Sequence, residues 1–173
     1  MIAGEFRSRK LKTVPGLNVR PTPDRLRESL FNVLAPRLPG ATFIDAYAGS
    51  GAVGIEAVSR GAGRVILIER NAEVIAVIRE NVAALGIAER VTVLRGRAVS
   101  FLAAHQADFV FLDPPYEHTN EYSDALRLLA GGRSKEVIAQ HSARLRLEDT
   151  YGELRQTRQI KQGDNVLSFY VRL

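Results

Sequence analysis

The chain has 173 residues, of which 46% are hydrophobic and 25% are charged, and it contains no cysteine. This length fits one domain with a sizeable core. The lack of cysteine excludes disulfides and thiolate metal sites, no stretch approaches the roughly 20 apolar residues of a membrane span, and the N-terminus has no signal-peptide apolar core. Three histidines stand far apart in the sequence. We therefore expect a cytoplasmic, monomeric protein without a metal centre.

The net charge of +5 is concentrated in the N-terminal segment. Residues 1–37 hold 8 Lys or Arg against 3 acids, whereas residues 38–173 hold 16 of each. This is the electrostatic footprint of a polyanion-binding arm, although charge runs are more often solvated tails. Phe6, Leu11 and Val14 interrupt the charges, a pattern that predicts a short hairpin within residues 1–19.

Beyond the arm, helices and strands are predicted to alternate. A helix capped by Thr22 is expected to begin at Pro23 and to end near Pro36. Strands are then predicted at 42–46, 64–69, 91–95, 108–112 and 136–140, and helices at 52–60, 71–85, 98–105 and 120–130. Such alternation indicates a parallel sheet covered by helices on both faces. Segments 152–160 and 165–172 are predicted to form a hairpin around Gly163-Asp164-Asn165.

A glycine-rich loop follows the first strand of this pattern. Gly49, Gly51 and Gly54 have the Gly-x-Gly-x-x-Gly spacing of nucleotide-binding turns, and Glu69 ends the next strand, where it can accept hydrogen bonds from ribose hydroxyls. Both a dinucleotide enzyme and an S-adenosylmethionine enzyme need these features. Asp45 favours the second, because a carboxylate repels a pyrophosphate and tolerates a sulfonium and an ammonium. Its alternative role is helix capping or turn formation.

The most informative motif is Asp113-Pro114-Pro115-Tyr116, directly after the apolar run 109–112. It combines a carboxylate, free carbonyls and an aromatic ring, which suits a flat ring that bears an amine. Pro-Pro after a strand is often only the start of a loop. However, Asp45, Glu69, Arg97 and Asp113 all fall at or just past predicted strand ends, and ligands of such sheets bind at that edge.

Six segments together resemble the RsmD family, the guanine-N2 methyltransferases of bacterial 16S ribosomal RNA. These segments are residues 4–11, 20–32, 47–51, 57–62, 113–116 and 167–170, so that the resemblance covers nearly the whole chain. It implies a Rossmann-like class I methyltransferase fold, with a mostly parallel seven-stranded sheet, helices on both faces, a C-terminal antiparallel hairpin and a small N-terminal hairpin and helix. We expect a basic RNA-binding extension at 1–37 and a methyltransferase domain at 38–173.

The resemblance also implies a reaction and its residues. S-adenosylmethionine would methylate the exocyclic N2 of one guanine in 16S ribosomal RNA, within the small subunit or an assembly intermediate. Asp113 and the Pro114 carbonyl would accept the amine's hydrogens, and Tyr116 would stack on the base. The expected cofactor-binding residues are Asp45, Tyr47, Gly49, Ser50, Gly51, Glu69, Arg70, Arg97, Ala98 and Asp113. The expected phosphate contacts are Arg7, Arg9, Lys10, Arg20 and Arg25.

Three other functions remain open from the sequence. An adenine-N6 methyltransferase acting on nucleic acid would use nearly the same chemistry at Asp113 to Tyr116, although no separate DNA-reading domain is visible. A catalytically silent assembly factor that binds S-adenosylmethionine would not need the intact Asp113 and Tyr116. A small-molecule methyltransferase would not need a basic arm.

Overall fold

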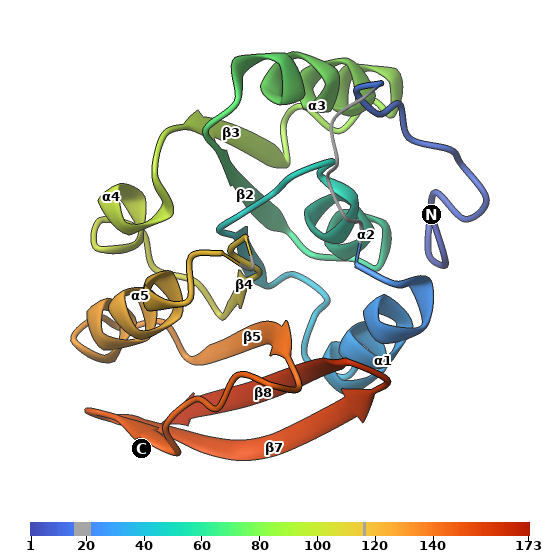
Figure 1. Ribbon diagram of the computed structural model, residues 1–173. Coiled ribbons are helices and arrows are strands. Elements are labelled where there is room, and N and C mark those ends of the chain that lie inside the picture. Colours follow the sequence, from blue (N-terminus) through green and yellow to red (C-terminus); the bar gives the residue numbers. More distant parts are fainter. Residues whose placement is uncertain (16–21, 116) are drawn as a thin grey trace.

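The computed structural model of the chain describes residues 1–15, 22–115 and 117–173 (Figure 1). The helices within these ranges are α1 (Asp24–Leu34), α2 (Ala52–Ser59), α3 (Ala72–Ala84), α4 (Ala98–Leu102) and α5 (Asn120–Ala130). The strands are β1 (Thr42–Asp45), β2 (Arg64–Glu69), β3 (Val91–Arg95), β4 (Phe109–Leu112), β5 (Glu136–Ser142), β6 (Thr150–Tyr151), β7 (Leu154–Gln162) and β8 (Asn165–Arg172).

All of these strands belong to one sheet with the order β3-β2-β1-β4-β5-β8-β7-β6. Neighbours from β3 to β5 run parallel, whereas β8, β7 and β6 are joined by antiparallel pairings. The predicted Rossmann-like fold with its C-terminal antiparallel hairpin is therefore confirmed. The predicted count of seven strands is wrong, because the two residues of β6 pair with β7 as an eighth strand.

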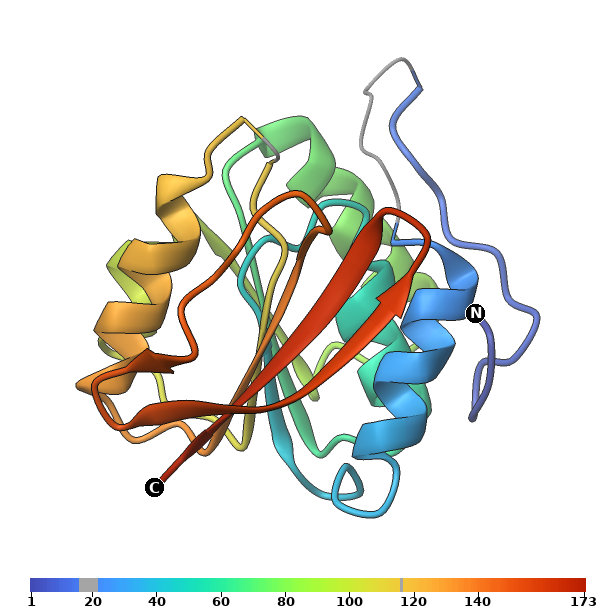
Figure 2. The same ribbon diagram turned by 60° about the horizontal axis from the view of Figure 1, so that its bottom comes forward.

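Helices cover both faces of the sheet, as predicted, with α1, α2 and α3 on one face and α4 and α5 on the other (Figure 2). The strands supply alternate residues to the two layers. The first core lies between the sheet and helices α1, α2 and α3, and the second lies between the sheet and helices α4 and α5. In β1, Phe43 packs into the first core and Ile44 into the second; in β4, Phe109 packs into the first and Val110 into the second. This alternation follows from the pleat of a strand whose two faces are both buried.

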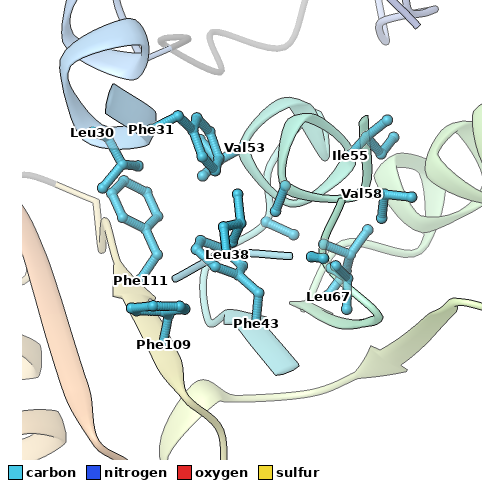
Figure 3. Close-up of a cluster of buried hydrophobic side chains, with 14 of the residues drawn as sticks. Leu30, Phe31, Leu38, Phe43, Val53, Ile55, Val58, Leu67, Phe109 and Phe111 are labelled. Carbon is cyan, nitrogen blue, oxygen red and sulfur yellow. The ribbon is translucent and has the colours of Figure 1, made fainter. Parts of the chain in front are cut away.

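The first core is built around aromatic side chains from α1 and the central strands (Figure 3). The ring of Phe31 in α1 lies 6.0 Å from that of Phe43 in β1, in a tilted arrangement. The guanidinium of Arg60 lies over the ring of Phe31, 5.2 Å from its centroid. Helix α1 is therefore packed against the sheet through Phe31.

The N-terminal arm is attached to helix α2 by hydrogen bonds, and the hairpin predicted within residues 1–19 has no strand in residues 1–15. The fully buried carboxylate of Glu56 accepts hydrogen bonds from the backbone N–H groups of Ile2 and Ala3, each at 2.9 Å. The hydroxyl of Ser59 accepts one from the N–H of Phe6 at 2.9 Å. The apolar interruption at Phe6 therefore marks a side chain buried in the core instead of one face of a hairpin.

Two local expectations at helix ends are also corrected. Thr22 does not cap α1: the N-cap position is Pro23, without a side-chain hydrogen bond, and Thr22 is buried beside the cavity instead. The helix expected at 98–105 ends at Leu102, and residues 103–104 form a turn. In contrast, Asn71 caps α3 with its side chain, which accepts hydrogen bonds from the N–H groups of Glu73 and Val74 at 2.8 and 3.3 Å.

Candidate active site

A cavity of about 500 Å³ opens at the carboxyl ends of the parallel strands. Asp45 ends β1, Glu69 ends β2, and Asp113 follows β4, so three separate strands deliver a carboxylate to one place. This is the edge at which open α/β sheets bind ligands, and the volume lies within the usual range of small-molecule sites. The predicted residues that line the cavity are Asp45, Tyr47, Gly49, Ser50, Glu69, Arg70, Arg97, Ala98, Asp113 and Pro114.

The glycine loop has the geometry that its spacing predicts. Gly49 and Gly51 adopt positive φ angles of 51° and 77°, and the N–H of Gly51 closes the turn on the carbonyl of Ala48 at 2.7 Å. Gly51 is the N-cap of α2 and does not itself line the cavity. At Gly54 a Cβ atom would lie 2.1 Å from Cδ2 of Leu67, so the third glycine allows α2 to approach β2 closely.

Asp45 is a buried carboxylate with one free acceptor. Its Oδ2 accepts a hydrogen bond from the N–H of Gly54 at 3.1 Å, whereas its Oδ1 has no hydrogen-bond partner. Burial raises the pKa of Asp45 from 3.8 to about 7, and the nearby charge of Glu69 adds to this rise. A buried carboxylate of this kind is stabilised in its charged form by a cation. The unpaired oxygen therefore makes Asp45 a candidate contact for a cationic ligand.

Glu69 is held by backbone donors on both of its oxygens. Its Oε2 accepts a hydrogen bond from the N–H of Gly49 at 3.0 Å, and its Oε1 accepts from the N–H groups of Arg70 and Asn71 at 2.7 and 2.9 Å. These bonds fix the carboxylate between the glycine loop and the start of α3. Each carboxylate oxygen can accept further hydrogen bonds, so Glu69 can still bind a diol.

Asp113 is positioned by a residue that the sequence analysis did not select. The amide of Gln140, in β5, donates a hydrogen bond from Nε2 to Oδ2 of Asp113 at 3.1 Å. Pro114, with no N–H, lies next to Asp113 on the cavity wall. Asp113 and the two prolines after β4 thus line the cavity together, as expected for a site that accepts an amine. Tyr116, predicted to stack on the base, lies outside the described residues.

Acids outnumber bases among the described residues that line the cavity. Five acids line it, against two basic side chains, Arg70 and Arg97; the acids are Asp45, Glu69, Asp113, Glu117 and Glu121. Burial and the nearby Glu121 carboxylate raise the pKa of the Tyr47 phenol, which keeps this hydroxyl protonated at neutral pH. The donor set fits a cation such as the sulfonium of S-adenosylmethionine and disfavours a pyrophosphate.

Several lining residues were missed by the sequence analysis. They are Thr22, Glu117, Glu121 and Gln140, together with Asn71 and Val74 at the start of α3. Gln140 could have been found, because it stands at the carboxyl end of the strand predicted at 136–140. The acid Glu121 carries no such signal, since only the packing of α5 beside the loop after β4 turns it toward the cavity.

The residues predicted to bind phosphate lie in two places. Arg7, Arg9 and Lys10 are exposed, but their segment is attached at Ser59, the last residue of α2, whereas Ala52 at the other end of α2 lines the cavity. An eight-residue helix separates these ends by about 12 Å. Arg25 lies in the first turn of α1 and lines a second, separate pocket together with the turn between β7 and β8, and Arg20 falls outside the described residues. Arg27 is paired with Asp24 at 2.8 Å.

The parallel sheet, its glycine loop and the acid-lined cavity at the strand ends define a class I methyltransferase fold. The family model described as "Conserved hypothetical protein 95" matches residues 1–171. The protein YlbH of Bacillus subtilis is 33% identical over 98% of this chain and 97% of its own length. The chain belongs to this family, which is the RsmD family of methyltransferases.

Two further relatives agree with this assignment. Ribosomal RNA small subunit methyltransferase D of Escherichia coli K12 is 43% identical over 118 residues, which cover 67% of this chain and 59% of that protein. The solved structure of the yhhF protein of Escherichia coli superposes with a TM-score of 0.87 at 34% identity and covers 99% of this chain and 96% of that one. The superposition therefore extends over nearly the whole of both chains, whereas the sequence match to methyltransferase D covers about two thirds of this one.

Proposed function

We propose that the chain transfers a methyl group from S-adenosylmethionine to the exocyclic N2 of a guanine in 16S ribosomal RNA, of the guanine(966) type. Methylation of ribosomal RNA follows from membership of the family and from the names of its relatives. Use of S-adenosylmethionine as the methyl donor follows from membership of this methyltransferase family. The choice of guanine N2 is our finer proposal. The observation that carries the proposal is the meeting of Asp113 and Pro114 with the acid-lined cavity at one sheet edge.

The cofactor would lie along the acids of the cavity. Asp45, whose Oδ1 is unpaired, would face the cationic methionine portion, and Glu69 would accept hydrogen bonds from the ribose hydroxyls. Gly49, which lines the cavity with a positive φ angle, would allow the backbone to approach this ligand closely. When bound, S-adenosylmethionine supplies an electrophilic methyl group on its sulfonium. Arg97 is the N-cap residue of α4, and backbone groups around Ala98 would contact the adenine.

The chain's own part in the reaction is to bind and aim the base. The lone pair of the guanine amine is delocalised into the ring, so the nitrogen is a weak nucleophile. Acceptors at Asp113 and at the Pro114 carbonyl would hold both amine hydrogens and turn the lone pair toward the methyl group. Positioning of this kind contributes roughly 7 to 11 kcal/mol in favourable cases. The base must leave any stack to enter the cavity.

The experiment is methyl transfer from labelled S-adenosylmethionine to small ribosomal subunits that lack guanine-N2 methylation, followed by nucleoside analysis. We expect N2-methylguanosine at a single position. N6-methyladenosine would move the chain to the adenine-N6 chemistry, and cofactor binding without transfer would favour a silent assembly factor.

The mechanism is tested by the substitution Asp113→Ala. This variant should lose methyl transfer while its affinity for S-adenosylmethionine stays largely intact, because most of the expected cofactor contacts lie elsewhere in the cavity, at Asp45 and Glu69. Asp124→Ala, at an exposed acid of α5, is the matched control and should retain full turnover. Retained turnover in Asp113→Ala would remove this carboxylate from the mechanism.

A further inference from the structure

Gln140 is a buried amide whose two ends have different surroundings. Its side chain in β5 lines the cavity, and the residue is only 3% exposed. Its Nε2 donates to Oδ2 of Asp113, while its Oε1 is buried and has no hydrogen-bond partner. The Tyr122 hydroxyl donates to the backbone carbonyl of Gln140 at 2.7 Å and holds this point of the strand in place. An unpaired acceptor in such a position is costly unless a ligand satisfies it.

The neighbouring carboxylate decides which end of the amide faces which way. An amide can be turned by 180° with little change of shape, so its orientation follows from its partners. In the turned orientation, the Gln140 oxygen would face the Asp113 carboxylate, and two acceptors would repel each other. The carboxylate therefore selects the orientation in which Gln140 gives a hydrogen to Asp113 and keeps its oxygen available beside the cavity.

We propose that Gln140 selects guanine as the methylated base, by accepting the hydrogen of guanine N1 at its Oε1. This inference rests on the proposed function. Among the RNA bases that carry an exocyclic amine, guanine alone has a ring N–H beside it. The amines of adenine and cytosine adjoin ring nitrogens that carry a lone pair. The proposed pose holds the amine at Asp113 and Pro114 and turns the N1 side of guanine, not its N3 side, toward Gln140. In the same pose, the ring nitrogen beside the amine of adenine or cytosine would direct a lone pair at the Gln140 acceptor.

Asp113 and Gln140 together therefore distinguish a guanine-N2 methyltransferase from an adenine-N6 methyltransferase that shares the motif at residues 113–116. Asp113 accepts a hydrogen from any exocyclic amine and cannot distinguish the bases. Gln140 adds a second acceptor with a fixed orientation, and rejection is strongest where a buried polar group would be left unpaired. Because the Gln140 oxygen is buried, a short shift of its side chain has to accompany entry of the base.

The test compares two bases at the methylated position, once that position has been mapped with the wild-type enzyme. Small subunits are reconstituted with ribosomal RNA that carries either guanine or 2-aminopurine there. The analogue keeps the N2 amine but has a lone pair at N1, and it also lacks O6. The ratio of kcat/KM between the two bases is measured for the wild type and for Gln140→Leu. Any effect of O6 is common to both proteins and cancels when their ratios are compared.

We expect the wild type to prefer guanine by about a hundredfold or more, and Gln140→Leu to reduce this preference to about tenfold or less. Its kcat on guanine should fall up to about a hundredfold, because Asp113 loses the hydrogen bond from Gln140, while its affinity for S-adenosylmethionine is unchanged. Gln140→Met, unbranched and of similar size, repeats the measurement if the leucine variant unfolds. Gln106→Leu, at an exposed glutamine before β4, is the control and should keep the full preference.

The outcomes distinguish this inference from the function on which it rests. If the wild type forms N2-methylguanosine and the Gln140 variants keep its preference for guanine, the inference is overturned and the function stands. If the wild type forms no N2-methylguanosine, both are overturned. A preference that collapses only in the Gln140 variants supports the inference, since a purely structural role would lower the rates with both bases equally.

Discussion

Asp45 is expected to reduce the stability of the protein for the benefit of its ligand site. The unfolded chain ionises this carboxyl near pH 3.8, whereas burial raises its pKa to about 7 in the folded protein. Between these values the folded state holds the extra proton, so stability should fall as pH rises from about 4 to about 7. At 1.36 kcal/mol for each pKa unit, the loss at higher pH is about 4 kcal/mol.

The substitution Asp45→Asn should recover part of this loss. The amide oxygen can still accept from Gly54, but the new NH₂ group stands where Oδ1 has no partner, at a cost of about 1–3 kcal/mol. We therefore expect a gain of about 1–3 kcal/mol in the free energy of unfolding at pH 8, and no gain at pH 5. Urea denaturation at the two pH values measures both.

Cofactor binding should change in the opposite direction. Asp45→Asn should weaken the binding of S-adenosylmethionine at least tenfold at pH 8, because a cation loses a charged partner, and calorimetric titration measures this. Asp108→Asn is the control of opposite sign: Lys135 and the N–H of Thr42 hold the pKa of Asp108 below its usual value, so that this variant should be less stable at pH 8. A variant at Asp45 that is equally destabilised at both pH values, or binds the cofactor unchanged, would refute the reasoning.

Three further predictions test other parts of the structure. Gly54→Ala should destabilise the fold by about 1–3 kcal/mol or more in urea denaturation, because the new Cβ would lie 2.1 Å from the Leu67 side chain. Gly132→Ala is the control, because a Cβ there would make only an ordinary van der Waals contact. Equal stability of the two variants would contradict the close packing of α2 on β2. Glu69→Gln should weaken S-adenosylmethionine binding about tenfold or more by calorimetry, because a glutamine amide has one oxygen that can accept hydrogen bonds, whereas a carboxylate has two. Unchanged affinity would exclude Glu69 from the ribose site. Replacement of Arg7, Arg9 and Lys10 together by alanine should weaken RNA binding and reduce its dependence on salt concentration. An unchanged salt dependence would mean that these side chains do not contact the RNA phosphates.

Most of the fold could be predicted because the sheet is buried on both faces. Continuous apolar runs identified the central strands, and both ends of β2, β3 and α5 agree with the sequence prediction. The two residues of β6 are too short for any periodicity to reveal. The arm was misjudged for another reason: apolar residues between charges look alike whether they line a hairpin or dock on a helix. The arm docks on α2 because the fully buried carboxylate of Glu56 binds the backbone N–H groups of Ile2 and Ala3, and the sequence does not show this contact.

The site was predictable where it follows strand ends and hidden where it depends on packing. Asp45, Glu69 and Asp113 were found because parallel strands bring their carboxyl ends to one edge. The hydrogen bond between Gln140 and Asp113 joins residues 27 positions apart, and no local pattern encodes it. The unpaired oxygens of Asp45 and Gln140 are likewise properties of the assembled molecule.

The position of β8 between β5 and β7 has a consequence for the order in which the protein is made. As the chain emerges during synthesis, β7 appears before β8, yet β7 reaches the sheet only through β8. Until then, the apolar edge of β5 has no partner on that side, and such edges are prone to pair with other chains. From the strand order we therefore expect the protein to pass through a folding stage in which the parallel half is formed while β5 still lacks β8. We expect this stage to be its period of greatest risk of aggregation.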